Sequence, residues 1–198
     1  TILEYLNGNI KIEEDVPKVA LVAEPPHLFN QKKVYESVLN NHSKFDRVLS
    51  WNKKLSHLPN YKFKPVTEIN QWNLLPDELD TSLFRVYSKD KLVSMVSSNK
   101  TLSKGHQFRM SCVDAVRDSV DVYGRGINEI KCKLDALRAY RFSVTIENGK
   151  FDNWFTEKII DCFLSGTIPI YHGCDNIGDY FNMDGIITFD TTDELKSI

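Results

Sequence analysis

Hydrophobic residues in the second half of the chain follow two alternating periodicities. Short runs rich in β-branched and aromatic residues predict strands, and apolar residues at helical spacing, such as Phe155, Ile159 and Phe163, predict helices between them. The predicted strands cover residues 91–97, 120–123, 141–146, 167–171 and 186–189. This alternation is typical of a parallel α/β sheet.

The first half of the chain predicts a smaller α/β lobe. Residues 18–23 form an apolar run that predicts a buried strand, which Glu24-Pro25-Pro26 ends because proline cannot continue a central ladder. A helix is predicted over 31–40 and a second strand over 45–51. Residues 52–80, which include three prolines, are predicted to be mainly loop.

The change of periodicity near residue 90 marks a domain boundary. We predict a short N-terminal lobe over residues 1–88 and a Rossmann-like, parallel-sheet lobe over residues 89–198. Residues 193–198 have the pattern of a first helical turn, so we expect the second lobe to continue beyond Ile198.

Composition and charge narrow the class of protein. Of the 198 residues, 41% are hydrophobic and 11% are aromatic, which is enough for a substantial core. Lys and Arg number 25 against 27 Asp and Glu, and the net charge of -2 argues against a nucleic-acid partner. No apolar run approaches the ~20 residues of a membrane span, and no signal-peptide pattern is present. We therefore expect no integral membrane segment and a cytoplasmic location.

Cysteines and histidines form no metal-binding pattern in the sequence. His27 and His172 suggest a metal, but the five histidines form no H-x-x-x-H or H-x-E pair. Reduced, mostly buried thiols are expected in place of zinc ligands or disulfides, because no C-x-x-C pair occurs among the four widely spaced cysteines, Cys112, Cys132, Cys162 and Cys174. We predict no metal site.

The stretch over residues 140–173 places polar residues where a predicted strand meets a helix. Glu147 and Asn148 follow the strand, and a helix is predicted to begin near Trp154, capped by Asp152 or Asn153. In an open parallel sheet, ligands bind beyond the carboxyl ends of the strands, and helix N-termini attract anions. This junction is therefore the first place to look for a binding site.

Charged residues of the predicted helix suit a phosphorylated ligand. Lys158 falls in its second turn, where the ammonium could reach a phosphate, and the Glu157 carboxylate could accept hydrogen bonds from sugar hydroxyls. Gly149 would let the backbone approach the ligand. A phosphorylated sugar or a nucleotide is the predicted ligand, and the alternative for Thr156-Glu157-Lys158 is a solvated face of an amphipathic helix.

A second basic residue is predicted at the same edge of the sheet. Residues 107–117 predict a helix after the first strand of the larger lobe, and Arg109 lies in its first turns, where an arginine can bind a diphosphate with two hydrogen bonds. Tyr123-Gly124-Arg125-Gly126 closes the next strand. A lone G-x-G is weak evidence for phosphate binding, and a structural turn is the favoured interpretation of these glycines.

The motifs in this region resemble the signature of the α1,3-fucosyltransferase family, YKF-x-x-x-FEN, then Y-x-TEK, then G-x-VPV-x-x-G. Their order and spacing match, and the resemblance is strong over residues 91–189. The matching segments are Tyr140-Arg141-Phe142, Glu147-Asn148, Thr156-Glu157-Lys158, Ser165-Gly166-Thr167-Ile168-Pro169-Ile170 and Gly173.

The resemblance implies a GT-B-like fold of two Rossmann-like lobes and inverting transfer of fucose from GDP-fucose to a glycan acceptor, without an obligatory metal. The donor-binding residues that it implies are Arg109, Glu147, Asn148, Trp154, Glu157 and Lys158. Trp154 stands where the family usually has tyrosine, and FEN here reads Ile146-Glu147-Asn148. An aromatic contact can survive the first change, but a contact through the tyrosine hydroxyl cannot.

The N-terminal lobe is expected to supply the general base and the acceptor contacts. Glu24, at the carboxyl end of a strand, resembles the family's catalytic base, and the alternative for this residue is an exposed or capping glutamate. Asp46 and Glu68 are alternative bases. Aromatic residues of this lobe could stack on acceptor sugars or belong to its core: Trp51, Tyr61 and Trp72. The competing hypotheses are a glycosyltransferase that uses another sugar nucleotide and a nucleotide-sugar-binding module without transfer activity.

Overall fold

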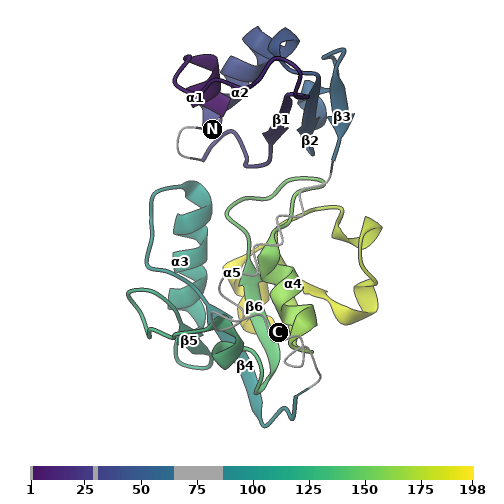
Figure 1. Ribbon diagram of the computed structural model, residues 1–198. Coiled ribbons are helices and arrows are strands. Elements are labelled where there is room, and N and C mark those ends of the chain that lie inside the picture. The colour runs from purple at the N-terminus through teal and green to yellow at the C-terminus, as the bar shows by residue number, and fades with distance from the viewer. Residues whose placement is uncertain (1, 29–30, 65–86) are drawn as a thin grey trace. The chain divides into compact units, whose positions relative to one another are not determined.

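A computed structural model describes residues 2–28, 31–64 and 87–198 of the chain (Figure 1). The chain divides into two compact units, Thr1–Val66 and Thr67–Ile198, which we call the N-terminal and the C-terminal unit. The Lys89 ammonium donates to the Ser165 carbonyl at 2.8 Å, so Lys89 already belongs to the C-terminal unit. The predicted boundary at residues 88 and 89 stays a prediction, because residues 65–86 lie outside the described residues.

The N-terminal unit contains a three-stranded parallel sheet of order β1-β2-β3. Its elements are α1 (Ile2–Leu6), β1 (Val19–Val22), α2 (Gln31–Asn41), β2 (Arg47–Ser50) and β3 (Tyr61–Phe63). Alternate residues of β1 are buried, and Ala20 and Val22 join Val38 of α2 and Val48 of β2 in one core. One strand is a correction, because β3 lies within the region predicted to be mainly loop. Its three residues are too few to show a period in the sequence.

The C-terminal unit contains a five-stranded parallel sheet of order β5-β4-β6-β7-β8. Its strands are β4 (Lys91–Val96), β5 (Asp121–Tyr123), β6 (Tyr140–Ile146), β7 (Ile168–His172) and β8 (Ile187–Thr188). Its α-helices are α3 (Lys104–Val116), α4 (Glu157–Leu164) and α5 (Thr192–Ser197), and the short 3-10 helix η5 (Lys133–Ala136) precedes β6.

Helices pack on both faces of this sheet. Val144 and Ile170 point to one face, where Val113 of α3 and Leu195 of α5 join them in the largest core cluster. On the other face, Tyr171 packs with Ile159 of α4 and other apolar residues. Parallel sheets normally need such cover on both sides. The predicted α/β fold class is confirmed, with a parallel sheet in each unit.

Two helices begin at residues other than those predicted. Helix α3 begins at Lys104, three residues before the predicted start, because the Ser103 hydroxyl accepts the His106 N–H at 3.2 Å and caps it. Helix α4 begins at Glu157 and not near Trp154, because the backbone is still extended at Thr156 (φ -125°, ψ -170°), the residue directly before the helix. Lys158 therefore lies in the first turn of α4, closer to the helix N-terminus than predicted.

The predicted end of α4 at Gly166 is confirmed. Gly166 has φ 65°, its N–H donates to the Phe163 carbonyl at 3.1 Å, and the Thr167 N–H donates to the Cys162 carbonyl at 2.8 Å. This pair of bonds is the Schellman motif, which favours glycine at the left-handed position. The turn returns the chain directly into β7.

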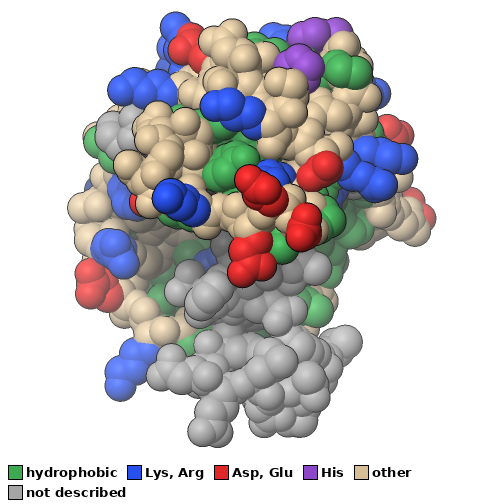
Figure 2. Space-filling model, turned by 45° about the horizontal axis from the view of Figure 1, so that its top comes forward, with side chains coloured by type: hydrophobic (Ala, Val, Ile, Leu, Met, Phe, Trp, Pro, Cys, Tyr) green, Lys and Arg blue, Asp and Glu red, His purple; other side chains and the backbone are tan. Residues whose placement is uncertain are grey.

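The cysteines of the described residues are free thiols, and charged side chains of both signs are mixed on the surface drawn in Figure 2. Cys112, Cys162 and Cys174 are buried as expected, and burial raises the pKa of Cys112 to about 11. On the face drawn in Figure 2, acidic and basic side chains of the described residues are interspersed, without an extended basic surface. Among the described residues, no helix is long and apolar enough to cross a membrane.

Candidate functional site

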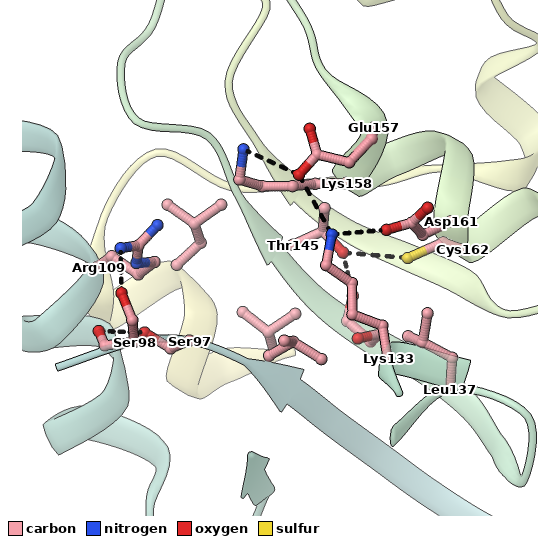
Figure 3. A pocket seen from close by; sticks show the side chains of 14 residues that line it. Ser97, Ser98, Arg109, Lys133, Leu137, Thr145, Glu157, Lys158, Asp161 and Cys162 are labelled. Carbon is pink, nitrogen blue, oxygen red and sulfur yellow. Dashed lines mark hydrogen bonds and ion pairs between the residues drawn. The ribbon is translucent and has the colours of Figure 1, made fainter. Parts of the chain in front are cut away.

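A pocket of about 130 Å³ lies at the carboxyl ends of β4 and β6, between α3 and α4 (Figure 3). Three predicted site residues line it: Arg109 from α3, and Glu157 and Lys158 from the first turn of α4. Ser97 and Ser98, which directly follow β4, also line the pocket. The structure therefore brings together residues that lie about 50 positions apart in the sequence, as expected for the carboxyl edge of a parallel sheet.

Arg109 carries a buried positive charge whose hydrogen-bond partners are neutral. Its side chain lies in the second turn of α3, and only 6% of the residue is exposed. Nη1 donates to Asn148 Oδ1 at 2.9 Å and Nη2 to Ser98 Oγ at 3.3 Å, while Nε has no hydrogen-bond partner among the described residues. Burial lowers the pKa of Arg109, and the more distant charge of Glu147 partly opposes this. A buried cation with an unused donor is suited to an anionic ligand.

Helix α3 is held in place by a close contact at Gly105. A Cβ atom at this position would lie 2.0 Å from the Asn148 carbonyl oxygen, which is far inside van der Waals contact. Only glycine lets the first turn of α3 pack this closely against the loop that follows β6. The contact positions Arg109, one turn further along α3, beside its partner Asn148.

Glu147 is a fully buried anchor for the start of α4. Its side chain has 0% exposure, and its carboxylate accepts the Thr156 N–H at 2.8 Å, the Thr156 hydroxyl at 2.7 Å and the Lys158 ammonium at 2.9 Å. It does not appear among the residues that line the pocket. The structure thus places Glu147 behind the ligand-facing side chains, and its predicted contact with a donor stays a prediction.

Lys158 keeps a donor for a ligand while it pairs with Glu147. Its ammonium also donates to Thr156 Oγ1 at 2.7 Å, so these bonds use two of its three N–H groups. The carboxylate of Glu157 lies 4.0 Å away. Because the Lys158 side chain is 22% exposed and lines the pocket, its remaining N–H can reach a phosphate there without breaking the pair with Glu147.

Lys133 and Asp161 complete the charged wall of the pocket, and the sequence reasoning missed both. The Lys133 ammonium lies 3.2 Å from Glu157 Oε1 and 2.9 Å from Asp161 Oδ2 (Figure 3). Asp161 could have been found, because it lies four residues after Glu157 and therefore on the same face of α4. Lys133 comes from η5, and its place at the pocket depends on tertiary packing that no sequence periodicity reports.

Trp154 is buried apart from the pocket. It has 0% exposure, packs edge-on against Phe151 at 6.1 Å between ring centroids, and is not among the lining residues. The structure therefore does not bring Trp154 together with Arg109 and Lys158. Its predicted donor contact is not tested by this arrangement.

Glu24 lies at the carboxyl edge of the sheet in the N-terminal unit. It follows the end of β1 by two residues and is partly buried, and its charge contributes to a raised pKa of Tyr35, for which burial is the main cause. The alternative base Asp46 lies at the opposite end of this sheet, where its carboxylate accepts the Lys18 N–H at 2.6 Å. Glu68, the other alternative, lies outside the described residues.

Candidate acceptor aromatics in the N-terminal unit have structural contacts. Trp51 is 3% exposed, and its Nε1 donates to the Ala23 carbonyl at 2.5 Å, which favours the core interpretation. The Tyr61 hydroxyl donates to the Ser50 carbonyl at 3.1 Å. Trp72 lies outside the described residues, so its role stays a prediction.

The described histidines and acids form no metal site. His172 Nδ1 lies 3.1 Å from the Phe189 carbonyl, and burial lowers the pKa of its imidazole. Among residues 2–28, 31–64 and 87–198, no group of three or more His, Cys, Asp or Glu side chains is arranged to hold a metal ion.

Comparison with known proteins identifies the family. The model of the glycosyltransferase family 10 (fucosyltransferase) C-terminal region matches residues 86–197. The chain belongs to glycosyltransferase family 10. The matched part of the C-terminal unit includes all the residues that line the pocket, so the family assignment rests on the region whose site is described above.

Relatives within family 10 are similar over limited parts of the chain. An α-(1,3)-fucosyltransferase, FucT, of Helicobacter pylori is 42% identical over 53 residues, which are 27% of this chain and 11% of the relative. The human 4-galactosyl-N-acetylglucosaminide 3-alpha-L-fucosyltransferase 9 is 28% identical over 112 residues, or 53% of this chain and 30% of the relative. The chain thus spans less than a third of the length of either of these curated relatives.

Solved structures of this family share the fold. A crystal structure of an α1,3-fucosyltransferase with GDP-fucose matches with a TM-score of 0.58 and 20% identity, covering 94% of this chain and 62% of that one. A second, with GDP, gives a TM-score of 0.55 at 19% identity and covers 93% of this chain and 78% of that one. At these identities the likeness establishes the fold.

Proposed function

We propose that the protein transfers fucose from GDP-fucose to a hydroxyl group of an acceptor sugar, with inversion at the anomeric carbon. The observation that carries this proposal is the buried guanidinium of Arg109, which has neutral partners and an unused donor at the carboxyl edge of a parallel sheet. Family membership supports fucose as the transferred sugar.

The reaction needs a base on one side of the sugar and positive charge on the other. The Glu24 carboxylate takes the proton of the acceptor hydroxyl as its oxygen attacks C1 of fucose. The bond between C1 and the GDP oxygen breaks, and GDP leaves with the electron pair. Arg109, Lys158 and the N-terminus of α4 stabilise the negative charge that develops on the diphosphate.

Site residues have separate roles in this proposal. Arg109 binds the diphosphate from α3, and Lys158 binds it from α4 with the N–H that its pair with Glu147 does not use. Asn148 contacts the ribose, and Glu157 accepts hydrogen bonds from hydroxyls of the fucose. A cytoplasmic location for this chemistry is part of the same proposal.

A thermal-shift assay against nucleotide derivatives tests the choice of donor. GDP and GDP-fucose should raise the unfolding temperature, while UDP, ADP and CDP derivatives at equal concentration should have little effect. A preference for UDP sugars would refute the fucosyl assignment in favour of another sugar nucleotide. Indifference to all of them would contradict a nucleotide-sugar site.

A turnover assay distinguishes a transferase from a binding module. We expect GDP release from GDP-fucose in the presence of an acceptor sugar, with a fucosylated product in equal amount. A 4-galactosyl-N-acetylglucosaminide, which the name of the human relative gives as acceptor, is the first to try. Tight GDP-fucose binding without either product across a panel of acceptors would favour the module without transfer activity.

A further inference from the structure

Lys133 connects η5 to α4 through two carboxylates in the wall of the pocket. Its ammonium lies 2.9 Å from Asp161 and 3.2 Å from Glu157, and its side chain is only 18% exposed. The sticks in Figure 3 show Lys133 on the same side of the pocket as Glu157 and Lys158, with Arg109 on the other side. Lys133 is therefore a structural link between two elements and part of the binding surface.

Glu157 and Asp161 would repel each other without this lysine. They lie four residues apart on one face of α4, where like charges destabilise a helix. Asp161 has only 4% side-chain exposure, and burial raises its pKa to about 6 although Lys133 opposes the shift. Burial also raises the pKa of Glu157, but the charges of Lys158 and Lys133 lower it by a larger amount. The net pKa of Glu157 therefore lies below its usual value.

The charge of Lys133 is already balanced by these two carboxylates. Arg109 has only neutral partners, and Lys158 has one carboxylate within 3.2 Å. Lys133 has two carboxylates within this distance, so of the three cations it is the least suited to bind a further anion. This arrangement favours an indirect role through Glu157.

We propose that Lys133 is a positioning residue that keeps the Glu157 carboxylate ionised and oriented to accept hydrogen bonds from hydroxyls of the transferred sugar, with Asp161 as its buried counter-ion. This role rests on the proposed function and adds to it the residue that determines discrimination between GDP-fucose and GDP. GDP lacks the sugar, so its affinity should depend much less on Glu157 than that of GDP-fucose.

Calorimetric titration of Lys133→Met with GDP and GDP-fucose tests the role. We expect the affinity for GDP-fucose to fall about tenfold, the size of one lost charged hydrogen bond, while the affinity for GDP stays within about twofold. Lys133→Arg, which keeps a charge able to reach both carboxylates, should restore most of the loss. Equal losses for both ligands would overturn the proposal, because they would indicate a phosphate ligand or general damage.

A double-mutant cycle with Glu157→Gln identifies the path of the effect. In the Glu157→Gln background, Lys133→Met should cause little further loss of GDP-fucose affinity. The pH dependence of GDP-fucose affinity in Lys133→Met supplies a second test. Without Lys133 the pKa of Glu157 should rise. As the pH falls, the extra affinity that the sugar provides should therefore be lost at a higher pH than in the wild type. An unchanged profile, or a full Lys133→Met effect in both backgrounds, would contradict the role.

Failure of the proposed function has a different signature. If the wild type binds neither GDP nor GDP-fucose, the nucleotide-sugar site itself is refuted, and the role of Lys133 with it. If the wild type binds both ligands and only the Lys133 predictions fail, the donor site stands and Lys133 has no part in sugar discrimination.

Discussion

The two parallel sheets of the protein present different chemistry at their carboxyl edges. The edge in the C-terminal unit carries three cations. Lys133 and Lys158 form short ion pairs with acidic residues, and Arg109 has neutral partners. The edge in the N-terminal unit is held mainly by neutral hydrogen bonds: Ser50 Oγ donates to the Val22 carbonyl at 2.8 Å, and Asn52 donates to the Tyr35 hydroxyl at 3.2 Å.

Both sheets are parallel, and each has a carboxyl edge where a ligand could bind. The side chains that follow the strands differ, so they determine which ligand each edge can bind. In the proposed reaction, the cations at the edge of the C-terminal unit bind the diphosphate. The Glu24 carboxylate of the N-terminal unit is the proposed acceptor of the hydroxyl proton. A substitution at one edge, followed by measurement of both donor affinity and turnover, tests whether the two edges have separate roles.

Glu24→Gln should have the largest effect and should change transfer without changing donor binding. Removing the base is expected to lower kcat by about 10²–10⁴-fold, because glutamine cannot take the hydroxyl proton. Affinity for GDP, measured by calorimetry, should stay at the wild-type value. Full activity in this variant would show that another group is the base.

Arg109→Met should weaken binding of GDP by about 10²-fold, because it removes a buried cation with two possible charge-assisted bonds to the diphosphate. The free energy of unfolding should change far less than the free energy of GDP binding, because the groups to which Arg109 donates are neutral. Arg109→Lys should be intermediate, because lysine keeps the charge but not the planar fork. A variant that loses stability and keeps its affinity would make Arg109 a structural residue.

Gly105→Ala should destabilise the protein by about 1–3 kcal/mol or more, although alanine favours helices over glycine by about 1 kcal/mol. Its Cβ would lie 2.0 Å from the backbone oxygen of Asn148, which cannot move without displacing the loop after β6. Chemical denaturation measures the change. Gly185→Ala is the matched control, because a Cβ there meets nothing within 4 Å. Equal effects at the two positions would refute the close contact.

Asp161→Asn should flatten the pH dependence of stability. The pKa of Asp161 is about 6 in the folded protein against an ordinary value of 3.8, so the folded state binds more protons between these values. The contribution of Asp161 to stability is present at low pH and is lost as pH rises through about 6, with an amplitude of up to about 3 kcal/mol.

Denaturation at several pH values measures this contribution. The wild type should lose stability relative to Asp161→Asn as pH rises from 4 to 7. A difference between the two proteins that does not change over this interval would mean that Asp161 has an ordinary pKa.

The sequence predicted regular elements better than it predicted local contacts. The strands of the C-terminal unit were predicted because buried parallel strands are continuous apolar runs. Strand β3 was missed because a three-residue strand shows no period, and the start of α4 was misplaced because the extended backbone at Thr156 leaves no pattern. Local periodicity reports burial, and it does not report a single backbone angle.

The location of the candidate site could be predicted from the sequence, but most of its hydrogen bonds and ion pairs could not. Arg109, Glu157 and Lys158 were found because helix N-termini at the carboxyl edge of a parallel sheet are common anion sites. The burial of Glu147 and Trp154 and the reach of Lys133 could not be read from the sequence, since each depends on which side chains meet in space.

A crystal structure of the protein with GDP tests the proposed donor site most directly. We predict the diphosphate in the pocket between α3 and α4, with its oxygens within hydrogen-bond distance of the Arg109 guanidinium and the Lys158 ammonium, and with the Lys133 ammonium still on Asp161. A diphosphate bound elsewhere, with Arg109 still on Asn148 and Ser98 alone, would contradict the central claim.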